Sequence, residues 1–134
     1  MASSSVRAPV TIRLPFAASS VAVARQRLRD WMVENDSSGE AIEDARVIIS
    51  ELVANAVRHA EPLSDGHILV TWALGDSAVE LAVTDGGGPT LPHNVNAPST
   101  ATAGRGMAIV ETLANDWWLN QGTDRKTVYA RIRR

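Results

Sequence analysis

The hydrophobic period of this chain changes several times along its length, and the order of these changes restricts the folds it can adopt. Strand-like segments show apolar residues at every second position, and helix-like segments show them every three or four. The strand-like segments are 10–16, 67–72, 78–83, 117–120 and 126–132, and the helix-like segments are 19–34, 40–59 and 107–113. The order predicts an α/β (α+β) sandwich, in which three helices cover one face of a mixed, mostly antiparallel sheet.

The length of the chain limits it to one domain. A chain of 134 residues supports one ordinary hydrophobic core and is too short for a second. We expect a single domain over residues 10–134, preceded by a flexible segment of residues 1–9. Residues 1–29 contain no acidic residue, as in organelle transit peptides, but a strand pattern begins at Val10, so we interpret them as part of the domain.

Composition excludes several classes of function. The formal net charge is −2 and the pI is about 5.9, so no broad basic surface favours nucleic acid. The chain has no cysteine for a disulfide or a thiolate metal site, and its 3 histidines are scattered. No apolar run approaches the roughly 20 residues that a membrane-spanning helix needs. We therefore expect a cytoplasmic protein that contacts neither nucleic acid nor a membrane.

One connection is unusually long. Residues 86–103 are low in charge and rich in Gly, Pro, Ser, Thr and Asn. Loops of this length inside compact domains are usually functional lids or disordered segments. Because this one lies between two glycine-containing motifs, we predict a lid between the third strand and the last helix.

The long helix predicted at 40–59 carries the first candidate site residues. Glu51 and Asn55 are four positions apart, which places them about 40° from each other around a helix, and Arg58 falls near the same stripe. A carboxylate and a carboxamide at this spacing can converge on one metal ion or one reacting oxygen. The alternative is the solvated face of an ordinary amphipathic helix.

The second candidate follows the apolar strand 78–83. Asp85 would present its carboxylate at the end of that strand, where it can accept a hydrogen bond from the exocyclic amine of adenine; guanine has no donor at that position. Gly87 leaves room for a base to pass close to the backbone. The alternative is a polar turn, which Asp-Gly pairs commonly form.

The third candidate is Gly104-Arg-Gly106, which we expect to open the helix that starts at Met107. The first amides of a helix are unpaired and its dipole favours anions, so a triphosphate can bind there. Arg105 can contact either the phosphates or a partner protein. The alternative is a glycine loop that binds nothing.

These three motifs, in this order and at these distances, resemble the Bergerat-type ATP-binding domain of bacterial sensor histidine kinases, type II topoisomerases and the heat-shock chaperone ATPase. The resemblance covers residues from about 10 to 133. Nothing in the sequence provides the helical hairpin that bears the phosphoacceptor histidine of sensor kinases. The likeness is therefore greatest to the stand-alone branch, the anti-sigma-factor serine/threonine kinases.

The resemblance implies a role for each motif. Asn55 would help to hold Mg²⁺ together with the ATP phosphates, and Glu51 would act as general base toward an attacking hydroxyl. Asp85 would select adenine, and Thr127 matches a family threonine that touches adenine through water. The expected ATP-contacting residues are Asn55, Arg58, Asp85, Gly87, Gly104, Arg105, Gly106, Met107 and Thr127.

Two residues depart from the family pattern. Pro89 stands where the family usually has a further glycine, so the first turn of the lid is stiffer or differently placed. Ala108 stands where family members often have another glycine, a small change that we expect to preserve close approach. His59 matches a position where the family often has histidine, but it lies about 80° from Glu51 around the helix. We expect His59 to pack or cap rather than to contact phosphate.

For function, the resemblance implies an anti-sigma factor that binds a sigma factor and phosphorylates a serine of a small antagonist protein. A first alternative is an ATP-binding regulatory module that senses nucleotide without phosphoryl transfer. A second is an interaction domain that has lost nucleotide binding. A homodimer is possible by family analogy.

Two adjacent tryptophans, Trp117 and Trp118, lie at the start of a predicted strand. Their side chains must point to opposite faces of the sheet. We expect one to pack in the core and the other to be available to a partner or a second copy of the chain.

Overall fold

The structure, a computed structural model, describes residues 8–88 and 101–133, with only the backbone described for 101–106. The elements are β1 (Val10–Pro15), α1 (Ser20–Glu34), α2 (Gly39–His59), β2 (His67–Leu74), β3 (Ala78–Asp85), α3 (Ala101–Leu113), β4 (Asp116–Gln121) and β5 (Lys126–Arg133). This order confirms the predicted one. The predicted flexible segment falls almost wholly on residues outside this description, as does most of the predicted lid.

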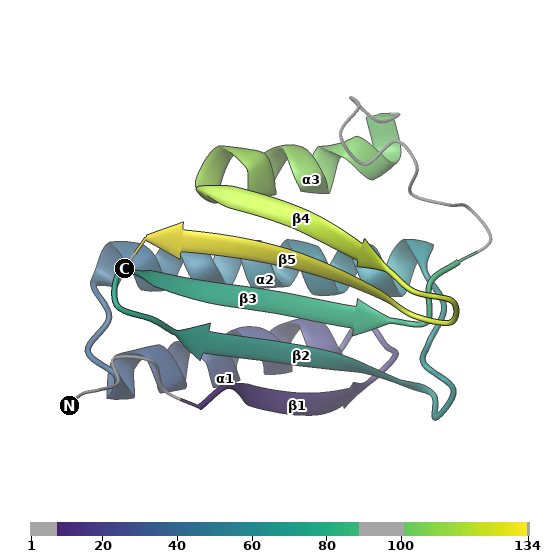
Figure 1. The fold of residues 1–134 in the computed structure, drawn as a ribbon, viewed down its shortest axis with the longest axis horizontal. Coiled ribbons are helices and arrows are strands. Elements are labelled where there is room, and N and C mark those ends of the chain that lie inside the picture. Colours follow the sequence, from purple (N-terminus) through teal and green to yellow (C-terminus); the bar gives the residue numbers. More distant parts are fainter. Residues whose placement is uncertain (1–7, 89–100, 134) are drawn as a thin grey trace.

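The strands form one sheet in the order β1-β2-β3-β5-β4 (Figure 1). All four pairings are antiparallel, so the expectation of a mixed sheet is wrong in this detail. The reason is the position of β5. The chain leaves β3, passes through α3 and returns as β4 in the direction of β3, but β5 lies between the two and is antiparallel to both.

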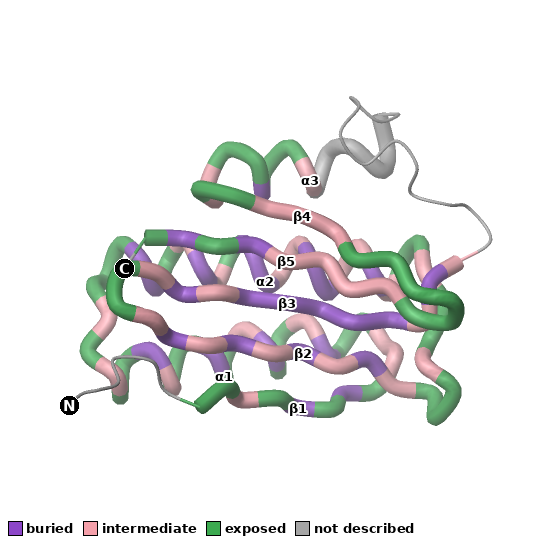
Figure 2. Tube along the Cα trace, in the orientation of Figure 1, coloured by how far each residue is buried: buried purple, intermediate pink, exposed green. Residues whose placement is uncertain are grey.

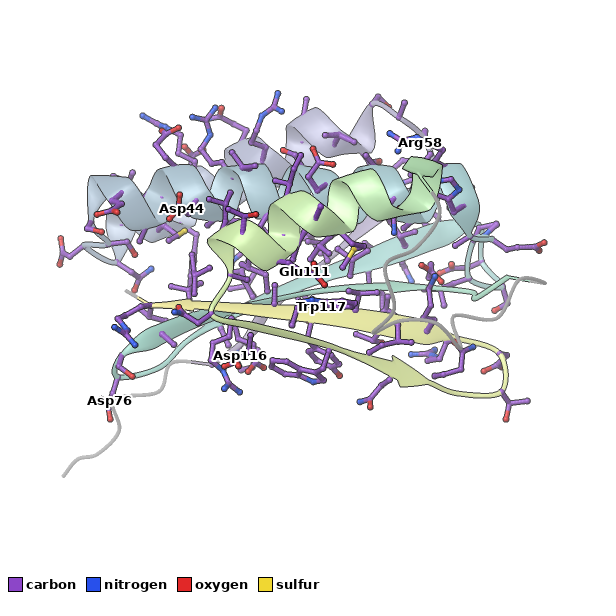
Figure 3. All side chains as sticks on the ribbon, turned by 90° about the horizontal axis from the view of Figure 1, so that it is seen from above. Asp44, Arg58, Asp76, Glu111, Asp116 and Trp117 are labelled. Carbon is purple, nitrogen blue, oxygen red and sulfur yellow. The ribbon has the colours of Figure 1, made fainter. Side chains whose placement is uncertain are left out.

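The three helices lie on one face of the sheet, as predicted (Figures 1 and 3). α2 is the central helix, and its start is fixed by Ser38, whose hydroxyl accepts a hydrogen bond of 3.1 Å from the Ala41 backbone N–H. The largest fully buried side chains are Trp72, Leu28, Met32, Ile48, Ile49, Ile68, Leu74, Leu81, Val53, Val70, Val79 and Val83. They come from α1, α2, β2 and β3, so the core lies between the helices and the middle of the sheet.

β3 is the most deeply buried strand. Its residues from Leu81 to Asp85 are all buried, whereas β2 alternates buried and half-buried residues (Figure 2). The alternation along β3 places Val79, Leu81, Val83 and Asp85 on the helix-covered face. The opposite face, which the helices leave uncovered, is called the open face below.

α3 begins six residues earlier than expected, at Ala101 rather than at Met107. The segment Ala101-Thr-Ala contains good helix formers, and the following glycines weaken a helix without breaking it. No helix of the described residues is long and apolar enough to cross a membrane.

The two adjacent tryptophans point to opposite faces, as predicted. Trp117 packs against the core, and its indole N–H lies 3.3 Å from the carboxylate of Glu111 on α3 (Figure 3). On the open face, Trp118 stacks on Tyr129 with 5.0 Å between ring centroids, and the guanidinium of Arg131 lies 4.9 Å from the Trp118 ring. Trp118 therefore has neighbours within its own chain.

Candidate functional site

Asp85, the last residue of β3, is a buried carboxylate. It is 1% exposed, and its Oδ1 accepts a hydrogen bond of 2.7 Å from the Gly87 backbone N–H. Its Oδ2 lies 3.7 Å from Nζ of Lys126. Burial raises the pKa of the Asp85 carboxyl, and neither the charge of Lys126 nor the Gly87 hydrogen bond fully offsets this effect. The Asp85 carboxylate is thus a buried hydrogen-bond acceptor at the end of the central strand, β3.

The pairing of β3 with β5 decides which residue stands beside Asp85. Asp85 pairs with Lys126, and Thr84 pairs with Thr127. The two threonine hydroxyls lie 2.8 Å apart on the open face. Paired residues share a face and successive residues alternate, so Thr127 points away from Asp85. The structure therefore does not bring the Thr127 hydroxyl to Asp85, and so it does not support the predicted contact of Thr127 with an adenine bound at Asp85.

Lys126 is the site residue that sequence reasoning missed. The alternation of strand residues could have found it. Ile132 and Ala130 are buried, and residues two positions apart lie on the same face, so Val128 and Lys126 also point inward. A lysine at an inward position reads as polar and breaks the apolar pattern. Its ion pair with Asp85 explains how it is accommodated with 15% of its side chain exposed.

The glycines after Asp85 join the end of β3 to the end of α2. The Gly86 N–H donates to the Glu61 carbonyl (2.8 Å), and the Glu61 N–H donates to the Gly87 carbonyl (2.7 Å). A Cβ at Gly86 would collide with the carbonyl oxygen of Pro62. Gly87 has φ +80°, a conformation that favours glycine. The motif therefore has a backbone requirement at Gly86 and Gly87, in addition to the space expected for a base.

The same end of the molecule carries the polar stripe of α2. Glu51 and Asn55 are half-buried, and neither side chain has a hydrogen bond or ion pair with the described residues. Arg58 is exposed at the end of the helix layer (Figure 3). His59 is also exposed and likewise unpaired within the described part of the chain, so the expectation that it packs is wrong. His59 is the last residue of α2, three positions beyond Ala56, the last buried residue of that helix.

Position along the helix brings this stripe toward Asp85. Asn55 lies one turn before His59, whose carbonyl oxygen would be 3.4 Å from a Cβ on Gly88. In Figure 1 the end of α2, the end of β3, the start of β5 and the start of α3 lie at one end of the domain. The polar stripe, Asp85, Lys126 and the third motif therefore share that end.

The third motif lies inside α3 rather than before it. Since α3 begins at Ala101, Gly104 is the fourth helical residue and falls among the first four backbone N–H groups, which lack helical partners. Arg105 and Gly106 follow in the next turn. The side chain of Met107 is half-buried and packs against the hydrophobic core, and its contact with ATP stays a prediction.

This arrangement suits a nucleotide better than a protein-held metal. No group of three or more His, Cys, Asp or Glu side chains within residues 8–88 and 107–133 would hold a metal ion. The unpaired carboxamide oxygen of Asn55 suits Mg²⁺ when phosphate oxygens and water complete the ligand set. The residues present therefore fit a Mg²⁺ ion that arrives with a nucleotide.

Comparison with known proteins agrees with this geometry. The sequence profile of the histidine kinase-like ATPase domain matches residues 14–132. The chain belongs to the histidine kinase-like ATPase family. Membership implies that this ATPase uses a nucleotide.

Curated relatives of this histidine kinase-like ATPase carry the name serine-protein kinase RsbW. The protein from Listeria monocytogenes serovar 1/2a is 29% identical over 119 residues, which cover 80% of this chain and 76% of the relative. The protein from Staphylococcus epidermidis is 27% identical over 120 residues, with the same coverage.

A solved structure has a similar fold. The crystal structure of the RsbU and RsbW domains of Rv1364c from Mycobacterium tuberculosis superposes with a TM-score of 0.72 at 27% identity and covers 95% of this chain. This histidine kinase-like ATPase spans 32% of that longer chain. The α+β sandwich described above is thus the fold of a solved family member.

Proposed function

We propose that this protein is an anti-sigma regulatory factor that uses Mg-ATP to phosphorylate a serine of a small antagonist protein. The observation that carries the proposal is the pair Glu51 and Asn55, half-buried one helical turn apart and unpaired within the described residues. On the same helix, the exposed Glu43 pairs with Arg46 at 3.1 Å. Glu51 is instead available to a ligand.

Each group has a place in the transfer step. Asp85 accepts a hydrogen bond from the adenine amine, and the first amides of α3 receive the phosphates. Glu51 takes the proton of the serine hydroxyl. The serine oxygen forms a bond to the γ-phosphorus of ATP, and the bond between the γ-phosphorus and ADP breaks. Asn55 and the phosphate oxygens would hold Mg²⁺, which would neutralise phosphate charge.

The choice of partners is part of the same proposal. The relatives are named serine-protein kinases, and the family resemblance implies a sigma factor and an antagonist protein as partners. Phosphorylation would prevent the antagonist from releasing the sigma factor. A cytoplasmic location, a single domain over residues 10–134 and a homodimer belong to this proposal as well.

Calorimetric titration tests the nucleotide site first. We expect the wild type to bind Mg-ATP in preference to Mg-GTP, Asp85→Asn to weaken that binding, and Asn55→Ala to remove its dependence on Mg²⁺. Absence of ATP binding by the folded wild type would refute the proposal.

A transfer assay then separates the kinase from a module that only senses nucleotide. The protein is incubated with γ-labelled ATP and candidate antagonist proteins, and phosphoserine is measured. We expect Glu51→Gln to abolish transfer while ATP still binds. Glu40→Gln, which removes a carboxylate from the first turn of the same helix, is the matched control and should transfer normally. Binding of ATP without transfer to any candidate antagonist would favour the sensing module.

A further inference from the structure

The ion pair between Asp85 at the end of β3 and Lys126 at the start of β5 leaves both side chains with unused hydrogen-bonding capacity. Lys126 Nζ lies 3.7 Å from Asp85 Oδ2, beyond the 2.7–2.9 Å or so of a tight charge-assisted hydrogen bond. An ammonium has three donors, and within the described residues Asp85 is the only acceptor near Nζ. Oδ1 of Asp85 already accepts from the Gly87 N–H, so Oδ2 is the oxygen with more acceptor capacity left.

The type of residue at this position is itself informative. Lys126 is the single lysine of the chain, whose 13 basic residues are otherwise all arginine. A planar guanidinium would fill more space beside Asp85, whereas an ammonium is a compact charge with rotatable donors. The one position where the chain uses lysine is therefore the inward position beside the buried carboxylate.

An acceptor and a donor side by side match the edge of a purine. In adenine the exocyclic amine is a donor, and the ring nitrogens N1 and N7 on either side of it are acceptors. Asp85 Oδ2 can accept from the amine while Lys126 Nζ donates to one of these nitrogens. Guanine offers the two functions in the reverse order, with O6 as acceptor and N1–H as donor, so the pair does not exclude guanine by hydrogen bonding alone.

We propose that Lys126 is a base-binding residue that donates to a ring nitrogen of adenine while Asp85 accepts from the adjacent amine. The inference rests on the proposed function, because it takes ATP as the ligand of this site. It replaces the water-mediated contact predicted for Thr127 with a direct contact from the neighbouring residue, on the face where Asp85 lies.

Base analogues test the contact in the intact protein. Affinities for ATP, 1-deaza-ATP and 7-deaza-ATP are measured by calorimetry for the wild type, Lys126→Met and Arg125→Met. Arg125→Met is the matched control, since it removes one positive charge from an exposed neighbouring residue. We expect the wild type and the control to bind one of the two analogues at least about tenfold more weakly than ATP, the loss of a hydrogen bond to a charged group. In Lys126→Met that penalty should fall below about twofold.

The outcomes separate this inference from the proposed function. If Lys126 only neutralises Asp85, Lys126→Met weakens all three nucleotides by the same factor and the analogue penalty persists, which would overturn the inference alone. Tighter binding of GTP than ATP by the wild type would overturn the assignment to adenine. No ATP binding by the wild type would overturn both. The analogue penalty in the wild type needs no variant to fold, and its absence for both analogues also refutes the contact.

The single lysine allows a direct second measurement. Incorporation of ¹³C,¹⁵N-labelled lysine gives one side-chain signal set from this chain, and no assignment is needed. We expect the Nζ and Cε resonances of Lys126 to shift on addition of ATP and to shift less with the discriminating deaza analogue. Unchanged Lys126 resonances at saturating ATP would contradict a direct contact.

Discussion

Two neighbouring pairs of residues, at the end of β3 and the start of β5, occupy opposite faces of the sheet. On the open face, Thr84 and Thr127 bring their hydroxyls to 2.8 Å. One residue further on, Asp85 and Lys126 lie 3.7 Å apart on the helix-covered face. The threonines satisfy each other, whereas the charged pair keeps a free acceptor and free donors. The comparison teaches that a step of one residue along the paired strands leads from a hydroxyl pair on the open face to a buried charged pair under the helices.

The largest expected effect comes from breaking the bend that follows Asp85. Gly86→Ala places a Cβ against the Pro62 carbonyl and displaces the backbone hydrogen bonds between residues 61 and 86–87. We expect a loss of about 3 kcal/mol in the free energy of unfolding, measured by urea denaturation. Gly39→Ala, where a Cβ meets nothing within 4 Å, is the control. Equal stability of the two variants would show that the bend is not held as described.

The next effect isolates the charged pair. Asp85→Asn removes the carboxylate that accepts from adenine and should weaken ATP binding by roughly 30-fold, about 2 kcal/mol. Calorimetry measures this change. The matched variant on the other face is Thr84→Val, which should leave the affinity for ATP unchanged. A loss of binding in both variants would mean that the two faces are not separated.

The pH dependence of stability and of ATP affinity tests the same charged pair. Burial raises the pKa of Asp85 above its ordinary 3.8, so the folded state retains this proton to higher pH than the unfolded state. As pH rises from 3.8 through the raised pKa, the stability of the wild type relative to Asp85→Asn should therefore fall. ATP binding requires the ionised carboxylate, so affinity should instead decrease as pH falls through that window, by up to about tenfold per pH unit. Both quantities are measured in the wild type and in Asp85→Asn. In the wild type, relative to Asp85→Asn, we expect stability to fall and ATP affinity to rise with increasing pH. An identical pH profile of ATP affinity in the two proteins would contradict the assignment.

A smaller effect is expected on the open face. Thr127→Val leaves the Thr84 hydroxyl without its partner and should cost about 1 kcal/mol of stability. The affinity for ATP should not change, because the side chain points away from Asp85. Thermal unfolding and calorimetry on one preparation provide both values. An affinity loss as large as that of Asp85→Asn would restore Thr127 as a nucleotide contact.

The smallest effect concerns the aromatic stack of the open face. Arg131 lies over Trp118 and pairs with Glu80 and Asp116, both at 3.4 Å, and all of these groups are partly exposed. Arg131→Met should cost only about 0.5 kcal/mol in urea denaturation. A cost above that of Thr127→Val would show that the open face contributes more to stability than its exposure suggests.

Most of the fold could be predicted from hydrophobic period. The order of elements and the single helix-covered face follow from apolar spacing, because burial of one face fixes that spacing. The absence of parallel neighbours could not be predicted in the same way. It depends on β5 pairing between β3 and β4, a long-range choice that local pattern does not encode.

The site was predicted by residue type and partly misplaced for that reason. Asp85 and Gly87 stand together as expected because they are adjacent in sequence and share one turn. Thr127 was assigned by likeness to a family threonine, although a shift of one residue in a strand moves a side chain to the other face. The start of α3 was placed too late because glycine was taken as a boundary, while the alanines before it extend the helix.

The central position of β5 also bears on how the protein is made. β5 is the last strand of the described residues, yet it supplies the hydrogen-bonding partner of β4 and the counter-charge of Asp85. While a nascent chain ends before Lys126, its sheet has a gap where β5 belongs and its base-recognition pair is half built. The sheet and the Asp85–Lys126 pair are therefore complete only after β5 has left the ribosome.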